Sequence, residues 1–223
     1  MIVWIVQAPP AEMPKDFRGI PLLELEWKAN QGDPRAMVDL AWKYYRGEGT
    51  HRDVPRALKL FRRAANKDYA EAKMQLGLFY GVGDGVPYDP NQARRWVDEA
   101  ARQELPMAQY ILGTYYETGF GVPGKGAQIH IAYEWFRRSA ELGCGAAMVK
   151  LGQYEMEGKV GPKNNAQACV WLRMASDLRA GGISSDLTRM EAALTPDEQT
   201  RVATQLKRLR AKWLPEPPAA APH

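Results

Sequence analysis

The sequence predicts an all-α protein: a right-handed α-solenoid of four helix–turn–helix repeats, with an N-terminal half-repeat and a C-terminal capping helix. Three observations support this fold class. A unit recurs four times along the chain, the alanine in its second half returning after 36, 39 and 36 residues. Each unit holds two segments whose apolar residues follow helical spacing, and glycine-rich turns separate these segments.

The first segment of each unit has an alanine, a leucine four residues later and then a small residue. These are Ala36, Leu40 and Ala41; Ala72, Leu76 and Gly77; Ala108, Leu112 and Gly113; and Ala147, Leu151 and Gly152. Residues four apart lie on one face of a helix, and the small residue allows a neighbouring helix to come close. Seven residues after each leucine, Gly47, Gly83, Gly119 and Gly158 are expected to end the helix in the left-handed conformation.

The second segment of each unit has an alanine followed three residues later by a large apolar residue. The pairs are Ala57 and Leu60, Ala93 and Trp96, Ala132 and Trp135, and Ala168 and Trp171. Because the tryptophans recur at one position of the repeat, we expect them to pack in the core rather than to stack on a ligand. One unit cannot bury its apolar face alone, so the units must stack on one another.

These repeated strings resemble the Sel-one-like repeat family, a branch of the tetratricopeptide-like solenoids. The resemblance is clearest in Leu76–Tyr80 followed by Gly83–Val86, and in Ala93–Trp96 followed by Ala100 and Ala101. The resemblance covers about residues 32–182 and divides them into repeats at 34–69, 70–105, 106–144 and 145–182. Two departures stand out. The third repeat has three extra residues, in the stretch 122–128, and the fourth has Glu155 where a tyrosine is expected.

The segments outside the repeats have their own predicted roles. Residues 1–19 form an N-terminal extension, and 20–182 form the solenoid, including a half-repeat that contains Leu22 and Ala29. Residues 183–214 form capping helices, of which one begins at Thr195-Pro-Asp-Glu198, a capping box with proline in the first turn. The tail, 215–223, is expected to be disordered.

Composition excludes few classes of function. Of the 223 residues, 45% are hydrophobic and 25% charged, which is ordinary for a folded protein. The net charge of +4 is small, and no apolar run is long enough to span a membrane. The sequence as it stands predicts a cytoplasmic protein. Val6-Gln7-Ala8 resembles the end of a signal peptide, so a periplasmic or secreted location stays open if the start is truncated.

No catalytic or cofactor-binding motif is recognisable, so we expect no enzyme, no cofactor and no metal site. The chain has three histidines and two cysteines, Cys144 and Cys169. In a pair of antiparallel helices these cysteines would lie about 14 Å apart along the axis, against the ~7 Å that a disulfide allows between Cα atoms. We therefore expect free thiols.

The candidate binding site is the stripe opposite the core leucine on each first helix, together with flanking arginines. It consists of Arg35, Val38, Trp42, Tyr45, Arg46, Met74, Leu78, Tyr110, Thr114, Glu117, Gln153 and Met156. The resemblance implies that this stripe lines the concave side of the solenoid. It is more apolar and aromatic than a solvated face, which is typical of an interaction site. The alternative is that these residues fill the inside of a tightly wound solenoid.

The sequence therefore predicts a monomeric scaffold or adaptor that binds another protein or a peptide segment. The resemblance also implies a narrower alternative, an immunity protein that neutralises a toxic bacterial effector. A different class, a nucleic-acid-binding solenoid, would use a ladder of arginines on the second helices: Arg62, Arg63, Arg94, Arg95, Arg137, Arg138 and Arg173. Acidic residues interrupt the ladder, which favours a solvated face of mixed sign.

Overall fold

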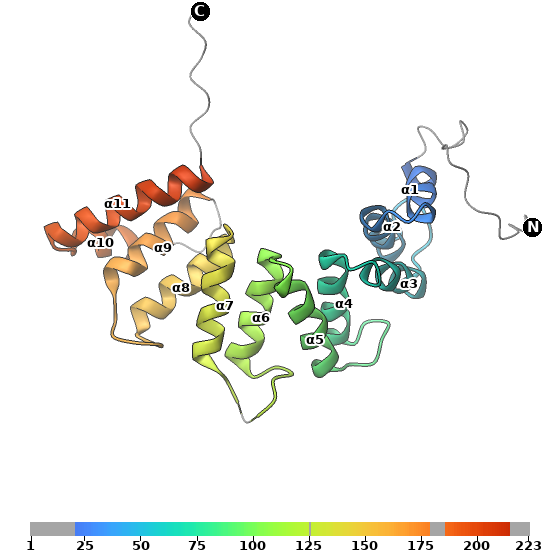
Figure 1. The fold of residues 1–223 in the computed structure, drawn as a ribbon, viewed down its shortest axis with the longest axis horizontal. Helices are drawn as coiled ribbons and strands as arrows, with labels where there is room; N and C mark the ends of the chain where they lie inside the picture. The colour runs from blue at the N-terminus through green and yellow to red at the C-terminus, as the bar shows by residue number, and fades with distance from the viewer. Residues whose placement is uncertain (1–20, 125, 179–185, 215–223) are drawn as a thin grey trace, which may run out of the picture. The chain divides into compact units, whose positions relative to one another are not determined.

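The computed structural model describes residues 21–124, 126–178 and 186–214, which form eleven helices and no strand (Figure 1). The helices are α1 (Pro21–Asn30), α2 (Pro34–Arg46), α3 (Val54–Ala65), α4 (Ala70–Val82), α5 (Pro90–Arg102), α6 (Pro106–Thr118), α7 (Ile129–Glu141), α8 (Gly145–Glu157), α9 (Asn165–Asp177), α10 (Asp186–Ala192) and α11 (Pro196–Trp213). The predicted N-terminal extension and the C-terminal tail lie outside the described residues. None of the described helices has the length and apolar character needed to cross a membrane.

The repeats form helix pairs, which confirms the predicted α-solenoid fold. Within each repeat the two helices pack on one another, α2 on α3, α4 on α5, α6 on α7 and α8 on α9. Two compact units divide the chain, one ending at Gln103 and the other beginning at Glu104. The first contains α1 to α5 and the second α6 to α11, so each unit holds two repeats and a terminal element.

The turn between the two helices is built in the same way in all four repeats. Gly47, Gly83, Gly119 and Gly158 end the first helices with φ of 74°, 81°, 77° and 70°, as predicted. The residue before each second helix then donates its N–H to a carbonyl in the last turn of the first helix. These bonds join Asp53 to Tyr44, Asp89 to Tyr80, Gln128 to Tyr116 and Asn164 to Glu155, at 2.7 to 2.9 Å. The bond closes the third turn at the same place despite its three extra residues.

The small residue after each core leucine permits close helix contact. A Cβ atom on Gly77 would lie 2.5 Å from Val97 Cγ2, and one on Gly113 would lie 2.7 Å from the Phe136 ring. At Gly152 the corresponding distance to Leu172 Cγ is 2.6 Å. Real Cβ contacts are longer than this, so these three positions require glycine in the present packing.

The tryptophans of the second helices are not the core residues that the sequence predicted. Trp96, Trp135 and Trp171 are half-buried, whereas the residue after each is buried: Val97 and Phe136 completely, and Leu172 to 7% exposure. The inward residue thus lies four positions after the alanine, not three, because the helix face that meets the first helix is rotated by one residue. Trp96 and Trp171 pack against the edge of the core.

The terminal elements cover the outermost repeats. In the first unit, Leu22 and Leu25 of α1 pack against the core. In the second unit, α11 packs on α9 through buried Val202 and Leu206. The predicted capping box at Thr195 and Glu198 is present. At the other end of α11, Lys212 Nζ donates to the Glu141 carbonyl at 2.7 Å.

Cys144 and Cys169 are free thiols in this fold and differ in exposure. Cys144 is the residue just before α8 and is half-buried, whereas Cys169 is completely buried and burial raises the pKa of its thiol. We expect an alkylating reagent to label Cys144 in the native protein and Cys169 only after unfolding. Mass spectrometry of samples quenched under native and denaturing conditions measures this. Equal labelling of both cysteines in the native state would contradict the packing of α9.

Candidate partner-binding surface

An aromatic cluster connects the first two repeats within the first unit. The Trp42 ring meets Tyr45 and Phe61 edge-on, with ring centroids 5.4 Å apart in both pairs. Phe79 of the second repeat lies 5.3 Å from Tyr45 and 5.4 Å from Phe61. Phe61 and Phe79 are buried, whereas Trp42 and Tyr45 are half-buried. The cluster therefore has a buried side that packs the core and a second side that reaches the surface.

Two guanidinium groups lie on the exposed side of this cluster. Arg46 Cζ lies 5.1 Å from the centre of the Trp42 ring, and Arg52 Cζ lies 5.4 Å from that of Tyr45. The Tyr45 hydroxyl donates to an Asp84 carboxylate oxygen at 2.7 Å. That hydrogen bond, together with burial, raises the pKa of Tyr45. We call Trp42, Tyr45, Arg46 and Arg52 the cation–aromatic patch.

The predicted binding-site residues of the first unit differ in how exposed they are to solvent. Arg35 and Arg46 are exposed, Trp42, Tyr45 and Leu78 are half-buried, and Val38 and Met74 are buried at 9% and 8% exposure. The positions two before the core leucine thus point into the packing of this unit. The positions that are exposed or half-buried on both first helices include those five and one before the leucine and two and six after it. In the first unit these positions hold Arg35, Asp39, Trp42 and Arg46 on α2, and Glu71, Gln75, Leu78 and Val82 on α4.

Two exposed apolar residues of the first unit were not singled out from the sequence. Val82 is 77% exposed at the end of α4, and Tyr88 is 61% exposed in the following turn. A Cβ atom on Gly83 would lie 3.1 Å from Tyr88 Cβ, so the turn brings Tyr88 close to the glycine that follows Val82. Counting six residues on from Leu76 would have found Val82. Tyr88 lies in a turn, where helical spacing carries no information.

In the second unit the predicted residues lie on α6 and α8. Tyr110, Thr114, Glu117 and Met156 are half-buried, and Gln153 is exposed. The Tyr110 ring lies 5.7 Å from Phe136. Glu117 accepts from Lys150 Nζ at 2.8 Å. In this unit the described contacts of Tyr110 and Glu117 are thus with Phe136 and Lys150, which lie outside the predicted stripe.

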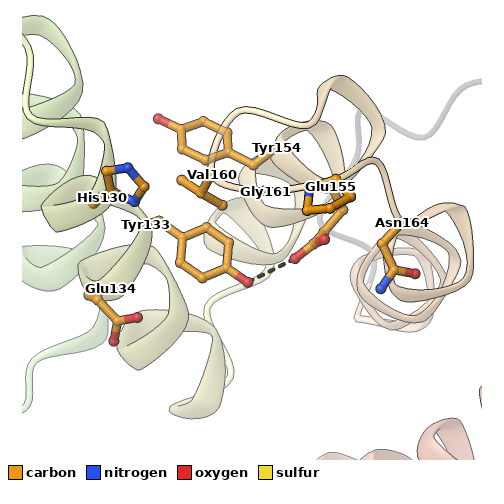
Figure 2. A pocket seen from close by; sticks show the side chains of 9 residues that line it. His130, Tyr133, Glu134, Tyr154, Glu155, Val160, Gly161 and Asn164 are labelled. Carbon is orange, nitrogen blue, oxygen red and sulfur yellow. Dashed lines mark hydrogen bonds between the residues drawn. The ribbon is translucent and has the colours of Figure 1, made fainter.

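A separate pocket of about 450 Å³ lies in the second unit, between α7, α8 and the turn that leads to α9 (Figure 2). Its lining is polar and aromatic: His130, Tyr133, Glu134, Tyr154, Glu155, Val160, Gly161, Pro162 and Asn164. The Tyr133 hydroxyl donates to Glu155 Oε1 at 2.8 Å, the dashed line in Figure 2. Burial and this carboxylate raise the pKa of Tyr133. The rings of Tyr133 and Tyr154 stack with centroids 6.2 Å apart. The sequence had marked Glu155 only as a departure from the repeat.

The arginine ladder is largely engaged within the protein. Arg137 pairs with Glu134 and Glu141 at 2.8 and 2.7 Å, and Arg173 pairs with Glu191. Arg63 donates to the Ala29 carbonyl, and the Arg138 guanidinium lies over Trp135. No group of three or more potential metal ligands occurs among the described residues.

Comparisons with known proteins identify the repeat. The family model described as Sel1 repeat matches residues 34–69, 70–105, 106–144 and 145–179. No curated protein matches the sequence.

Three solved structures illustrate the likeness. The protective antigen c5321 of uropathogenic Escherichia coli, which displays this repeat fold, is 28% identical with a TM-score of 0.67, over 86% of this chain and 44% of its own. A Sel1 repeat protein from Oxalobacter formigenes is 33% identical with a TM-score of 0.55, over 60% and 98%. The immunity protein Pa5087 from Pseudomonas aeruginosa shares the fold at 18% identity, with a TM-score of 0.55, over 97% and 85%. This chain thus spans less than half the length of the E. coli antigen. With four matched repeats in register, it belongs to the Sel1 repeat family.

Proposed function

We propose that this chain is a non-catalytic scaffold that binds a protein partner through the exposed face of its first helices, with the cation–aromatic patch as the main anchor. The observation that carries the proposal is the half-exposed Trp42–Tyr45 pair under two guanidinium groups. Aromatic residues and arginine are the side chains most enriched at the energetic centre of protein interfaces. Exposed Val82 and half-buried Leu78 extend the same unit's apolar surface.

Membership of the Sel1 repeat family supports a binding role, since repeat solenoids present extended surfaces to partners. An immunity function, in which the partner is a toxic effector, is the narrower version of this proposal. The likeness to Pa5087 supports only its fold, because the two chains are 18% identical. A nucleic-acid partner is less favoured because Arg137 and Arg173 of the ladder are neutralised by carboxylates.

The test begins with a pull-down from the native organism, in which mass spectrometry identifies the retained protein. We expect Arg46→Ala to weaken that partner by about 2 kcal/mol, roughly thirtyfold in affinity. Its effect on stability should stay within about 0.5 kcal/mol, because the Arg46 side chain is 57% exposed and its ion pair with Glu48 lies at the surface. Isothermal titration and thermal melting measure the two quantities.

The charge-matched control is Arg62→Ala, which removes an exposed arginine from α3. It should change neither affinity nor melting. Trp42→Ala is a poorer test than the sequence had suggested, because Trp42 also packs on buried Phe61 and its removal should lower the melting temperature. Equal affinities for wild type and Arg46→Ala would place the binding surface elsewhere.

A further inference from the structure

We propose that the pocket between α7, α8 and the turn before α9 is a receptor for an arginine side chain of the protein partner. This proposal rests on the proposed function in one respect, namely that a protein partner supplies the arginine. The preference for a guanidinium group follows from the residues of the pocket alone. Glu155, which lines this pocket, departs from the repeat pattern. Repeats one to three have tyrosine at this position, Tyr44, Tyr80 and Tyr116.

Glu155 is a half-buried carboxylate that accepts a hydrogen bond from a neutral group. Its hydrogen-bond donor is the Tyr133 hydroxyl, and none of the described lysines or arginines forms an ion pair with it. By contrast, Glu134 on the pocket wall pairs with Arg137 and Glu117 nearby pairs with Lys150. A carboxylate that is partly removed from water without a cation is costly, and a cation that enters the pocket would offset that cost.

The first unit contains the same pair with a cation in place. There the Tyr44 hydroxyl donates to Glu26, so a tyrosine on the first helix meets a glutamate on the element before it. In the second unit the roles are exchanged, since Tyr133 lies on α7 and Glu155 on α8. Arg56 completes the first pair: its guanidinium carbon lies 4.1 Å from the centre of the Tyr44 ring and its Nη2 lies 3.3 Å from Glu26 Oε1. The fold thus shows how a guanidinium group binds to a tyrosine–glutamate pair.

The arginine of the first unit has no counterpart in the fourth repeat. Arg56 precedes the repeat's alanine, Ala57, and Gln167 precedes the equivalent Ala168. Asn164 likewise stands where the first repeat has Asp53. The tyrosine–glutamate pair of the second unit therefore lies beside an open pocket of about 450 Å³ instead of an internal guanidinium (Figure 2). A guanidinium group has both a planar face for the Tyr133 ring and donors for the second Glu155 oxygen, whereas an ammonium group has donors but no planar face.

The test uses the full-length chain, ¹⁵N-labelled, titrated with N-acetyl-arginine methylamide while amide shifts are recorded. We expect saturable shifts confined to the residues around Tyr133, Glu155 and Asn164. N-acetyl-citrulline methylamide, a neutral analogue of the same shape, should bind at least tenfold more weakly, because a charge-assisted hydrogen bond is lost. The lysine analogue should also bind more weakly. Equal shifts with citrulline, or shifts centred elsewhere, would overturn the proposal.

Two substitutions make the test specific. Glu155→Gln keeps an acceptor for Tyr133 and removes the charge, so arginine binding should fall about tenfold. Gln167→Arg should provide the missing guanidinium from within the chain and block the probe in the same way. The matched control is Glu157→Gln, on the same helix but paired with Lys159 outside the pocket, which should leave the titration unchanged.

These results separate the arginine pocket from the proposed function. If partner affinity depends on Arg46 but the arginine probe gives no shift, the pocket assignment is wrong and the scaffold role stands. If the probe binds and Gln167→Arg blocks it, but partner affinity is indifferent to Arg46, the pocket stands and the patch is wrong.

Discussion

Gly77→Leu should unfold the first unit at a markedly lower temperature than wild type. Even the Cβ atom of the new residue would lie 2.8 Å from the Ala93 carbonyl oxygen and 3.2 Å from the Val97 amide nitrogen, both backbone atoms of α5. Backbone cannot move aside as a flexible side chain can, so α4 and α5 must separate. We expect a loss of about 3 kcal/mol, the upper end for overpacking, measured by urea unfolding followed by circular dichroism.

The control for this substitution is Gln75→Leu, two residues earlier on α4 and half-buried. It adds the same side chain on the other side of the helix and should change stability by less than about 0.5 kcal/mol. Gly77→Ala should fall between the two variants. A melting temperature for Gly77→Leu within a degree of wild type would show that α4 and α5 do not meet at this glycine.

Phe136→Ala should cost the second unit about 3–5 kcal/mol, the range for a completely buried phenylalanine. The Phe136 ring fills the space beside Gly113 and lies 5.8 Å from the ring of buried Tyr154. Its removal leaves a cavity between α7 and its neighbours that Gly113 cannot fill. Thermal and urea unfolding of the full chain measure the loss.

The adjacent substitution, Trp135→Ala, is the matched comparison. Trp135 is half-buried, with the Arg138 guanidinium 4.9 Å from its ring centre, so its truncation should cost clearly less than that of Phe136. This order is the reverse of what the repeat pattern alone predicts, which gives the tryptophan positions to the core. A larger loss of stability for Trp135→Ala than for Phe136→Ala would mean that Trp135, and not Phe136, is the residue of α7 that faces the core.

Fold class and turns were predictable because each depends on local spacing. The leucine and the glycine seven residues later determine where each first helix packs and ends, and the structure has Gly47 and its equivalents in the left-handed conformation. The inward face of the second helices was predicted one residue out. Each alanine is followed by apolar residues both three and four positions later, and either could lie on the same helix face as the alanine. Which of the two is buried, Trp135 or Phe136, depends on where the neighbouring helix packs.

The candidate site was predictable in part. Trp42, Tyr45 and Arg46 do reach the surface together, whereas Val38 and Met74 are buried. A stripe drawn on one helix takes no account of the helices that cover its edges, and this accounts for the difference. The pocket at Glu155 depends on Tyr133, 22 residues earlier on another helix, so no pattern within one repeat could reveal it. In the sequence, the glutamate at position 155 in place of the repeat's tyrosine was the feature that pointed to this pocket.

The backbone bond that closes each turn also explains how these repeats can diverge in length. In three repeats it spans nine residues, as from Tyr44 to Asp53, and in the third it spans twelve, from Tyr116 to Gln128. Both helices of the third repeat still begin and end at the usual distance from the bond. Mutation can therefore lengthen the chain at this point without shifting a helix, and new surface loops can evolve there while the packed frame of the repeat is conserved.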